Sequence, residues 1–552
     1  MSKREHGIAA GLIVLISCGL YLPFLKNPFI FDDWVLFGGN GFSYFATQPF
    51  DFFHTRNLPN FSLAVTYILG SGMVTQRIVS LLLHIASVLA LYKLTFELLR
   101  FTPRPDLAGR ATANEQEAAF WALAAAAAFA IHPVTVYGAG YLVQRSIVLA
   151  TMFSLLSILL LLRGLRRGAY ADAVSAALLY TIAVYSKEHC ILLPVVGAVA
   201  VFLVAADRRF GLRYGLVYLA ACLPAAIMVA MLSLRVIGGT YEPDHVAVAD
   251  QLEGVFGLDT ANMSLARSAV VQAGLFYKYL FLWIWPDVRA MSIDLRVDFS
   301  QHASMGWILL KIVAFAMFGA VGGFLLWCRG RPGLIGFGML FVWILFLVEF
   351  SAARFQEPFV LYRCYLWAPG IVIAMVAALR LIPGRAVFAL FLLVLPLLFF
   401  QARDRLETFS HPFLLWQDAA AKLPAQPVPW GSRALHSLAR EYMYAGDSGK
   451  AMEIAERCMA QYPDTYHCYF AKGAILAGQG EPGLALPFLE RAVALKPKSE
   501  IAHQRLAWTL EKLGRIEEAL AALRNASALG FSGADKEIKR LNAARQNPPR
   551  EQ

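Results

Sequence analysis

Apolar stretches alternate with short polar segments from residue 7 to about residue 402, and the alternation then stops. Each stretch holds roughly 16–25 residues, which as a helix is long enough, or nearly so, to cross a hydrocarbon core of about 30 Å. The pattern therefore predicts an all-α, polytopic membrane helical bundle over residues 1–405, with about eleven spans. The predicted spans are 7–25, 76–100, 117–133, 146–163, 171–186, 189–206, 214–237, 306–328, 333–352, 363–380 and 386–402.

The residues after 405 carry a different pattern, in which small residues recur every 34 positions. This spacing relates Gly446, Gly480 and Gly514, then Ala451, Ala485 and Ala519, and also Pro463 and Pro497. A 34-residue period with Gly at a turn and small residues where helices cross is typical of tetratricopeptide (TPR) repeats. We expect a linker at 406–431, a soluble TPR α-solenoid of three repeats at 432–531 and a tail at 532–552. Such arrays commonly bind a peptide or protein, although a purely structural cap is the alternative.

Composition supports the membrane assignment, because 58% of residues are hydrophobic, 16% are charged and the mean hydropathy is +0.55. These values exclude an ordinary soluble globule. The net charge of +11 does not indicate nucleic acid, because most basic residues of the membrane part lie in short loops between spans. There they set the orientation of the chain instead.

The basic residues predict which loops face the cytoplasm. With a cytoplasmic N-terminus, the inner loops carry Arg100, Arg104 and Arg110; Arg163, Arg166 and Arg167; Arg208, Arg209 and Arg213; Arg329 and Arg331; and Arg380 and Arg385. The first span is expected to stay as a signal anchor, because no cleavage-site pattern follows it. Segment 268–286 is expected to be re-entrant or interfacial rather than spanning. This topology places the TPR domain outside, which means the periplasm if the chain sits in a bacterial inner membrane.

Two adjacent acids, Asp32 and Asp33, follow the first span in the sequence FDDW. A membrane protein has no structural need for a carboxylate pair at the mouth of a span, so these acids are the predicted seat of chemistry. One carboxylate near another has a raised pKa, which suits proton abstraction from a hydroxyl. An alternative for Asp33 is that it positions Asp32 or makes a structural hydrogen bond. No cofactor is expected, although two acids could also hold a divalent metal ion.

Later outward-facing segments supply mainly cations and aromatic residues. Arg77, Arg145, Lys187 and Arg363 are predicted to grip an anionic group such as a phosphate. The alternative for each cation is an anchor at the membrane interface or a partner of a nearby acid. Pairing of Lys187 with Glu188 is as acceptable as phosphate binding, and Arg56 is expected to be a solvated loop charge. For His54 and His84 a structural role is expected.

The cysteines suggest one cross-link and no metal site. Cys458 and Cys468 fall on the second helix of one repeat and the first helix of the next, so a disulfide is compatible with export. Whether they pair is left open by the sequence. The other five cysteines lie in or beside apolar spans, and no Cys/His cluster with metal-ligand spacing occurs in the sequence.

The ordered motifs FDDWVLFGG, QRIVSLLLH, IHPVTVYGAGYLVQR, YSKE, YLFLWIWP and YRCYLWAPG resemble those of the protein O-mannosyltransferases and of the transmembrane and TPR-containing O-mannosyltransferases. The resemblance runs from about 7 to 531. It implies a polytopic inverting glycosyltransferase of the GT-C fold, which takes a sugar from a polyprenyl-phosphate carrier on the outer face. This family is expected to act without a metal.

The resemblance also implies roles for individual residues. Asp32 matches the catalytic acid and Asp33 the accompanying acid, while Lys187 and Glu188 match a Ser-Lys-Glu element. An HP...QR segment of the family is matched by His132, Gln144 and Arg145. An HRxYL-like element is matched by Arg363 and Tyr365. Tyr362 stands where relatives often have His, so a role that needs an imidazole at this position is not carried over.

The leading hypothesis is transfer of a sugar to a Ser or Thr hydroxyl of an exported protein that the repeats recruit. A lipid-linked glycan or a surface polysaccharide is the alternative acceptor. Two alternative functions are not enzymatic, namely a transporter and an assembly scaffold. Transporters tend to place broken spans and ionisable sites near the bilayer midplane, whereas the unusual polar residues of this chain gather toward one predicted face.

Overall fold

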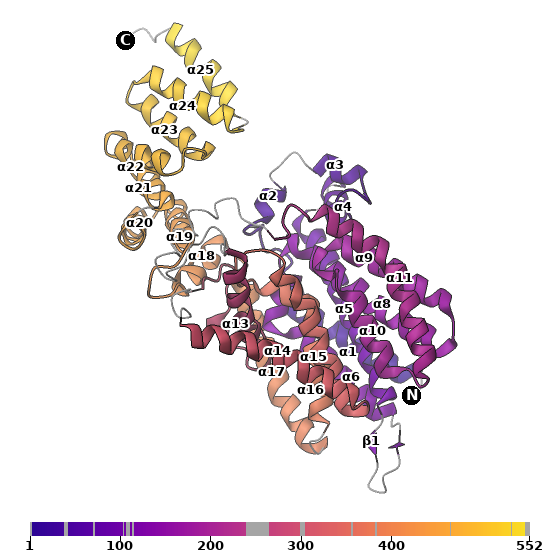
Figure 1. Cartoon of the computed structure of the whole chain (residues 1–552). Helices are drawn as coiled ribbons and strands as arrows, with labels where there is room; N and C mark the ends of the chain where they lie inside the picture. The colour runs from indigo at the N-terminus through magenta and orange to yellow at the C-terminus, as the bar shows by residue number, and fades with distance from the viewer. Residues whose placement is uncertain are drawn as a thin grey trace. The chain divides into compact units, whose positions relative to one another are not determined.

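The computed structural model describes residues 3–37, 42–69, 72–102, 104–105, 111–112, 115–238, 264–297, 304–354, 357–380, 384–463, 465–531 and 533–546. These residues are helical apart from turns, loops and one antiparallel pair of two-residue strands. The chain divides into two compact units (Figure 1). The first comprises 1–295 and 299–411, and the second 296–298 and 412–552.

The first unit is a bundle of α-helices joined by short 3-10 turns. Its α-helices and strands are α1 (Lys3–Tyr21), α2 (Asp33–Phe37), α3 (Phe42–Thr47), α4 (Asn57–Ile68), α5 (Met73–Phe101), β1 (Arg104–Pro105), β2 (Ala111–Thr112), α6 (Glu115–Ile131), α7 (Val136–Ala139), α8 (Arg145–Arg167), α9 (Tyr170–Ser186), α10 (Leu193–Val204), α11 (Arg208–Leu232), α13 (Ser264–Ile284), α14 (Met305–Trp327), α15 (Gly330–Phe346), α16 (Cys364–Leu379) and α17 (Gly384–Thr408). The 3-10 turns relevant below are η2 (Pro133–Thr135), η3 (Leu142–Gln144), η4 (Glu188–Cys190), η7 (Leu347–Phe350) and η8 (Leu361–Arg363).

Six helices in the described part of the chain are long and apolar enough to cross a membrane, or seven if the bent pair of α6 with 133–139 counts as one span. Eleven spans were predicted. The difference arises partly at predicted spans 171–186 and 189–206, where α9 has 17 residues and α10 has 12. A helix rises about 1.5 Å per residue, so α10 by itself is too short to cross. Segment 268–286 coincides with most of α13, which is not among the six.

The helix α6 is followed by a break at which the chain changes direction. The Ala-rich sequence of α6 suits a helix, and Pro133 begins a new turn because proline cannot donate the next helical hydrogen bond. The chain bends by 53° at this point. It then runs through α7 and η3 before α8 begins at Arg145. This irregular stretch, 132–144, lies against the loop that carries the two acids, as the contacts below show.

Close helix packing positions the start of α16. A Cβ at Gly338 would lie 2.5 Å from the carbonyl oxygen of Gly370, and a Cβ at Gly370 would lie 2.7 Å from the oxygen of Gly338. The backbones of α15 and α16 therefore touch, as small residues permit at helix interfaces. This contact holds η8, with Tyr362 and Arg363, beside the end of α15.

The second unit is a helical repeat array, so the predicted TPR fold is confirmed. It contains α18 (Pro412–Ala421), α19 (Ser432–Tyr444), α20 (Ser448–Gln461), α21 (Tyr466–Gly478), α22 (Pro482–Leu495), α23 (Glu500–Lys512), α24 (Ile516–Ala528) and α25 (Ala534–Gln546). Gly446, Gly480 and Gly514 occupy the turns inside the pairs with φ of 79°, 82° and 74°, values that glycine adopts without the clash of a Cβ. Segment 406–431 was predicted as a linker, but it contains α18, and the tail contains α25.

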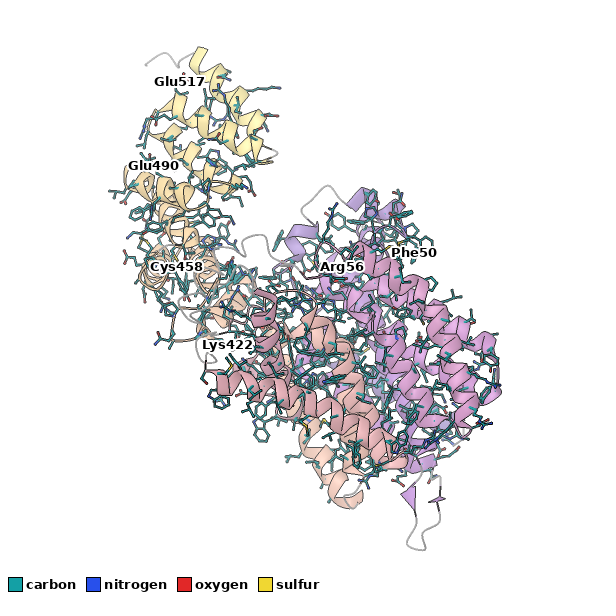
Figure 2. The ribbon with its side chains drawn as sticks, viewed as in Figure 1. Phe50, Arg56, Lys422, Cys458, Glu490 and Glu517 are labelled. Carbon is teal, nitrogen blue, oxygen red and sulfur yellow. A yellow bond between two sulfur atoms is a disulfide. The ribbon has the colours of Figure 1, made fainter. Side chains whose placement is uncertain are left out.

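Cys458 and Cys468 form a disulfide that joins α20 to α21, with their Cα atoms 5.3 Å apart. Cys458 is labelled in Figure 2. The bond closes a loop with a sequence separation of 10. The pairing that the sequence left open is therefore present in the structure, and it suits an oxidising compartment.

We expect the double substitution Cys458→Ser and Cys468→Ser to lower the stability of the repeat array by about 2–3 kcal/mol, because the unfolded array regains the entropy of an open loop. Urea unfolding of the full chain in detergent, followed by protease sensitivity at 412–546, measures this change. Cys328→Ser is the control, because Cys328 is an exposed free thiol in the first unit. Equal midpoints for the double variant and the control would contradict the expectation.

Candidate functional site

The two acids of FDDW point into different environments. Asp33 is fully buried, and its carboxylate oxygens accept hydrogen bonds from the backbone N–H groups of Ile30 at 3.1 Å and Val143 at 3.0 Å. Asp32 is exposed, and its backbone N–H donates to the hydroxyl oxygen of Tyr141 at 2.9 Å. Asp33 thus ties the first loop to the stretch after α7, which leaves the Asp32 carboxylate at the surface.

Burial is the main reason that the pKa of Asp33 rises to about 7. The two backbone N–H groups and the nearby Arg77 oppose this rise, and the charge of Asp32 adds the smallest contribution. The predicted mechanism, mutual repulsion of two carboxylates, is therefore a minor effect. The raised pKa also belongs to the buried acid, which is held by the backbone, and not to the exposed one.

Arg77 and Arg145, two of the four predicted phosphate-binding cations, use their donors within the protein. Arg77 donates to the backbone carbonyls of Asn27, Pro28 and Gly140 at 2.6–2.8 Å. The fully buried guanidinium of Arg145 donates to Ser80, Ser62 and Gln76. A guanidinium has five N–H donors, and these bonds occupy most of them. Both arginines therefore hold the first loop and η3 in place, and few of their donors are left for a phosphate.

Lys187 has a different environment. Its side chain is 5% exposed, its Nζ lies 5.6 Å from the centre of the Tyr362 ring, and it has no ion pair with any described residue. Its neighbour Glu188 instead accepts two hydrogen bonds from Arg56, which is labelled in Figure 2. The expected solvated role of Arg56 is thus wrong, and the alternative pairing of Lys187 with Glu188 is not formed.

One tyrosine contacts the segment with the two acids, and another contacts Lys187. Tyr141 is 1% exposed, and burial, followed by the charges of Asp32 and Asp33, raises its pKa, with a further contribution from Tyr362. The ring of Tyr362 lies next to the ammonium of Lys187. The contacts therefore form two pairs, Asp32 with Tyr141 and Lys187 with Tyr362, from four segments that are far apart in the sequence.

Behind Lys187 lies a buried ion cluster that sequence reasoning missed. Glu349 in η7 is 3% exposed and pairs with Arg354 at 3.0 Å and with Arg363 at 3.1 Å. The ring of His189 lies 3.4 Å from its other carboxylate oxygen. A single acid within the apolar run LFLVEF was the available signal, because ionisable residues in such runs are functional candidates by default.

Three of the four residues predicted to line the acceptor cavity are buried. His132 stacks on Trp283 with ring centres 4.0 Å apart, and Gln144 is 4% exposed. The Tyr365 hydroxyl is 2.6 Å from Nδ1 of His84, whose Nε2 lies 3.0 Å from the oxygen of Ala130. Glu188, the fourth, is partly exposed and binds Arg56. No group of three or more potential metal ligands occurs in the parts of the chain that the structure describes.

Burial lowers the pKa of Lys187 to about 7, with Arg56 as the next contribution and Glu188 acting in the opposite direction. Arg363 and Arg354 add smaller effects that also lower it. A buried ammonium surrounded by guanidinium groups is costly unless an anion approaches it. The site therefore combines an exposed carboxylate with a cationic wall that a bound anion would stabilise.

Comparison with known proteins identifies only the repeats. A tetratricopeptide repeat family model matches residues 476–545, which covers the later part of the predicted array and most of α25. No curated protein matches the chain. Among solved structures, the first TPR domain of the human RPAP3 protein is 18% identical, with 21% of this chain and 97% of that chain covered and a TM-score of 0.20.

Two further structures are similar at the same low level. The Sgt2 TPR domain from Aspergillus fumigatus is 18% identical, covers 23% of this chain and 90% of that one, and has a TM-score of 0.21. The APC/C hetero-tetramer Cut9-Hcn1 is 13% identical, with 88% and 89% covered and a TM-score of 0.22. Scores this low carry no functional conclusion.

Proposed function

We propose that this chain is a membrane glycosyltransferase of the GT-C type that moves a sugar from a polyprenyl-phosphate donor to a Ser or Thr hydroxyl of an exported protein. The acceptor side is the periplasmic face of a bacterial inner membrane. The proposal rests on the motifs described above, which resemble those of the O-mannosyltransferases. The disulfide, which suits a domain in an oxidising compartment, and the six apolar helices of the described part are consistent with this placement.

The observation that carries the proposal is an exposed Asp32 carboxylate beside Tyr141 and a buried Lys187 beside Tyr362, both within the first unit. A group transfer from a phosphate carrier needs both features. A base must accept the proton of the incoming hydroxyl, and a cation must stabilise the phosphate as it leaves. In this chain Asp32 supplies the first feature and Lys187 the second.

The chemistry assigns each residue one step. The carboxylate of Asp32 accepts the proton of the Ser or Thr hydroxyl, and that oxygen forms a bond to the anomeric carbon of the sugar. The bond from the anomeric carbon to the phosphate oxygen breaks, and the phosphate keeps the electron pair. Lys187, with Arg363 behind it, stabilises the added negative charge. Attack from the side opposite the phosphate inverts the anomeric configuration.

The second unit supplies the acceptor in this proposal. TPR arrays present the inner helices of successive repeats as a surface for a peptide or protein, and this array is covalently attached to the enzyme. Recruitment raises the effective concentration of an acceptor segment near the site. A chain that lacks the repeats is therefore expected to keep the reaction but lose most acceptor proteins.

The proposal is tested by mass spectrometry of exported proteins from cells with and without the gene. We expect defined Ser- or Thr-containing peptides to carry a sugar mass only when the gene is present. Loss of a sugar from a lipid-linked glycan or surface polysaccharide, with unchanged proteins, would overturn the protein acceptor. Unchanged glycans in all three classes would overturn the transferase.

The low pKa of Lys187 predicts a pH dependence of donor use. The free enzyme carries protonated Lys187 below about pH 7 and neutral Lys187 above it, and only the protonated form attracts a phosphate. We expect kcat/KM for the donor to fall as pH rises from about 7 to 9, since kcat/KM reports on the free enzyme. Lys187→Arg should remove this fall because Arg stays charged.

The neutral variant Lys187→Met provides the second measurement. Loss of a charge-assisted hydrogen bond to a phosphate is worth about 1.5–3 kcal/mol, so kcat/KM at pH 6.5 should drop roughly 10- to 100-fold. Activity of Lys187→Met equal to that of the unmodified chain at pH 6.5 would show that Lys187 does not meet the donor.

A further inference from the structure

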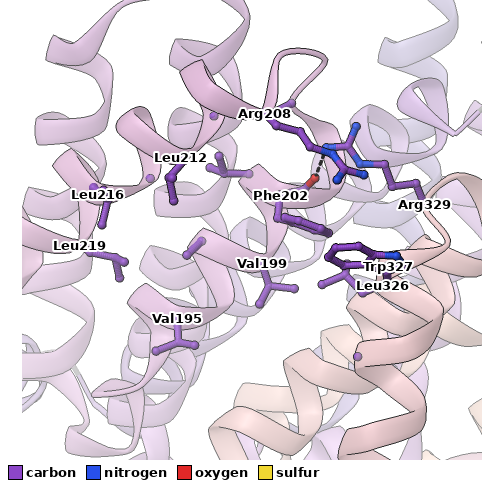
Figure 3. A pocket seen from close by; sticks show the side chains of 16 residues that line it. Val195, Val199, Phe202, Arg208, Leu212, Leu216, Leu219, Leu326, Trp327 and Arg329 are labelled. Atoms are coloured by element: carbon purple, nitrogen blue, oxygen red, sulfur yellow. Dashed lines mark hydrogen bonds between the residues drawn. The ribbon is translucent and has the colours of Figure 1, made fainter.

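A cavity of about 510 Å³ lies in the first unit, between α11 and α14, with α10 as its floor (Figure 3). Pockets for small molecules fall in the range of about 300–1,000 Å³. None of the predicted site residues lines this cavity. Its walls are apolar, and Val199, Leu212 and Leu216 project into it in Figure 3. The cavity therefore belongs to a second feature of the molecule, separate from the Asp32 site.

Two arginines close one end of the cavity. The rings of Phe202 and Trp327 are stacked with their centres 6.1 Å apart. The guanidinium of Arg329 lies 5.4 Å from the Phe202 ring centre, and that of Arg208 lies 5.3 Å from the Trp327 ring centre. Because each guanidinium lies over one ring of the same stacked pair, both cations gather at this end of the cavity, where Figure 3 shows their side chains. Like charges gathered in this way repel each other unless an anion lies near them.

The charges of these arginines are not balanced by acids within the described chain. Neither Arg208 nor Arg329 forms an ion pair with a described residue, and the neighbouring Asp207 instead accepts a hydrogen bond from the backbone N–H of Arg209 at 2.8 Å. Arg329 donates to the carbonyl of Phe202 at 2.9 Å, but its Nε is buried without an acceptor. The end of the cavity is thus prepared for an anion.

Local backbone structure adds to the positive potential. Arg208 is the first residue of α11, whose N-terminus is capped by Asp207, and Arg329 is the N-cap of α15, with no side-chain hydrogen bond at that cap. Arg329 has φ of 52° and ψ of −167°, a conformation that a residue with a side chain rarely adopts. The fold retains an arginine at a backbone position that favours glycine.

The helices that form the remaining walls of the cavity expose apolar side chains. Among the six candidate spans, α11 and α14 are the least buried, with 22% and 17% of their apolar windows inside the protein. Leu212, Leu216 and Phe324 are 66%, 55% and 68% exposed. Apolar faces of this extent are unfavourable in water and suit lipid chains.

We propose that this cavity is a binding site for an anionic phospholipid, with its phosphate between Arg208 and Arg329 and one acyl chain along the apolar walls of α10, α11 and α14. Both arginines belong to loops that the sequence places on the cytoplasmic side, where anionic lipids give the leaflet a negative surface potential. The proposal rests on the membrane placement proposed above, but not on the transfer reaction.

The test uses the full chain, purified in detergent and stripped of lipid. Phosphatidylglycerol is added in increments, and bound lipid is counted by native mass spectrometry together with the unfolding temperature. We expect one tightly bound phosphatidylglycerol and a higher unfolding temperature. Phosphatidylcholine and inorganic phosphate are the comparison ligands, because the first lacks net charge and the second lacks acyl chains.

Variants separate the two halves of the site. The double variant Arg208→Gln and Arg329→Gln removes the charges, and Val199→Phe fills the cavity without changing charge. Each is expected to weaken phosphatidylglycerol binding at least tenfold. Arg213→Gln is the matched control, because Arg213 is an exposed residue of the same helix that does not line the cavity, and it should bind as the unmodified chain does.

Three results would overturn the proposal. They are equal binding of phosphatidylglycerol and phosphatidylcholine, equal stabilisation by inorganic phosphate, and unchanged phosphatidylglycerol binding in both the double variant and Val199→Phe.

A folded Arg329→Gly variant covers the case in which the glutamine variants do not fold, because glycine accepts the backbone conformation at 329. It should lose binding while keeping its unfolding temperature without lipid. None of these outcomes depends on sugar transfer.

Discussion

The variant Asp32→Asn is expected to lose at least about 100-fold in the rate of sugar transfer, because an amide cannot accept the proton of the incoming hydroxyl. The side chains of Asp and Asn have nearly the same shape, and Asp32 is exposed, so the fold should persist. Binding of the polyprenyl-phosphate donor should change little, since the cations that meet the phosphate are intact. Transfer to an exported acceptor, measured by intact-protein mass spectrometry, gives the rate.

The control for this experiment is Asp51→Asn in the same loop. Asp51 accepts a hydrogen bond from the backbone N–H of Phe53 and lies beside His54, so its replacement perturbs the loop without touching the proposed base. Full activity of Asp32→Asn would refute the assignment of the base. Equal losses in both variants would show that the loop conformation, rather than proton transfer, limits the rate.

The second large effect is expected at Glu349, whose removal should destabilise the first unit. In Glu349→Ala, the buried Arg354 and Arg363 lose the carboxylate that pairs with both of them, and breaking a buried pair in this way costs about 3–5 kcal/mol. We expect a clear fall in the unfolding temperature of the first unit in detergent, and low yield from membranes. Scanning calorimetry of the full chain measures it.

A matched control is Glu117→Ala. Glu117 pairs with Arg380 at 3.2 Å, but its side chain is 25% exposed, compared with 4% for Glu349. Water can therefore reach the pair, and the loss should be smaller. Glu349→Gln keeps a hydrogen-bond acceptor without the charge. Its loss of stability should lie between those of Glu349→Ala and Glu117→Ala. Equal stability of Glu349→Ala and Glu117→Ala would show that the buried cluster has no special structural weight.

The architecture was predictable because its signals are local. Apolar runs predict helices, and a 34-residue period predicts helix pairs with glycine at the turns, since both patterns follow from the geometry of a single helix or repeat. The number of membrane spans was overestimated. Composition identified 189–206 as apolar, but the helix there starts only at Leu193 and ends at Val204, where the chain leaves the helical conformation.

The candidate site was predictable only in part. The sequence indicated unusual ionisable residues near the ends of apolar runs, including Asp32 and Lys187, and their place in the site stays a prediction. It could not tell which cations were already occupied. Arg77 and Arg145 bind carbonyls and hydroxyls from other segments, and Arg56 lies 132 positions from its partner Glu188. Glu349 was overlooked within an apolar span.

The sequence by itself determined that this protein is helical, that its first part is unusually apolar, and that its C-terminal part is a TPR array. These properties depend on residue type and spacing within one helix or repeat. Tertiary structure alone decided which acid is buried, which cations hold the loops, and which cation has no ion pair among the described residues. Such choices depend on desolvation and on partners from distant segments, because a buried charge is stable only beside the groups that the fold brings to it.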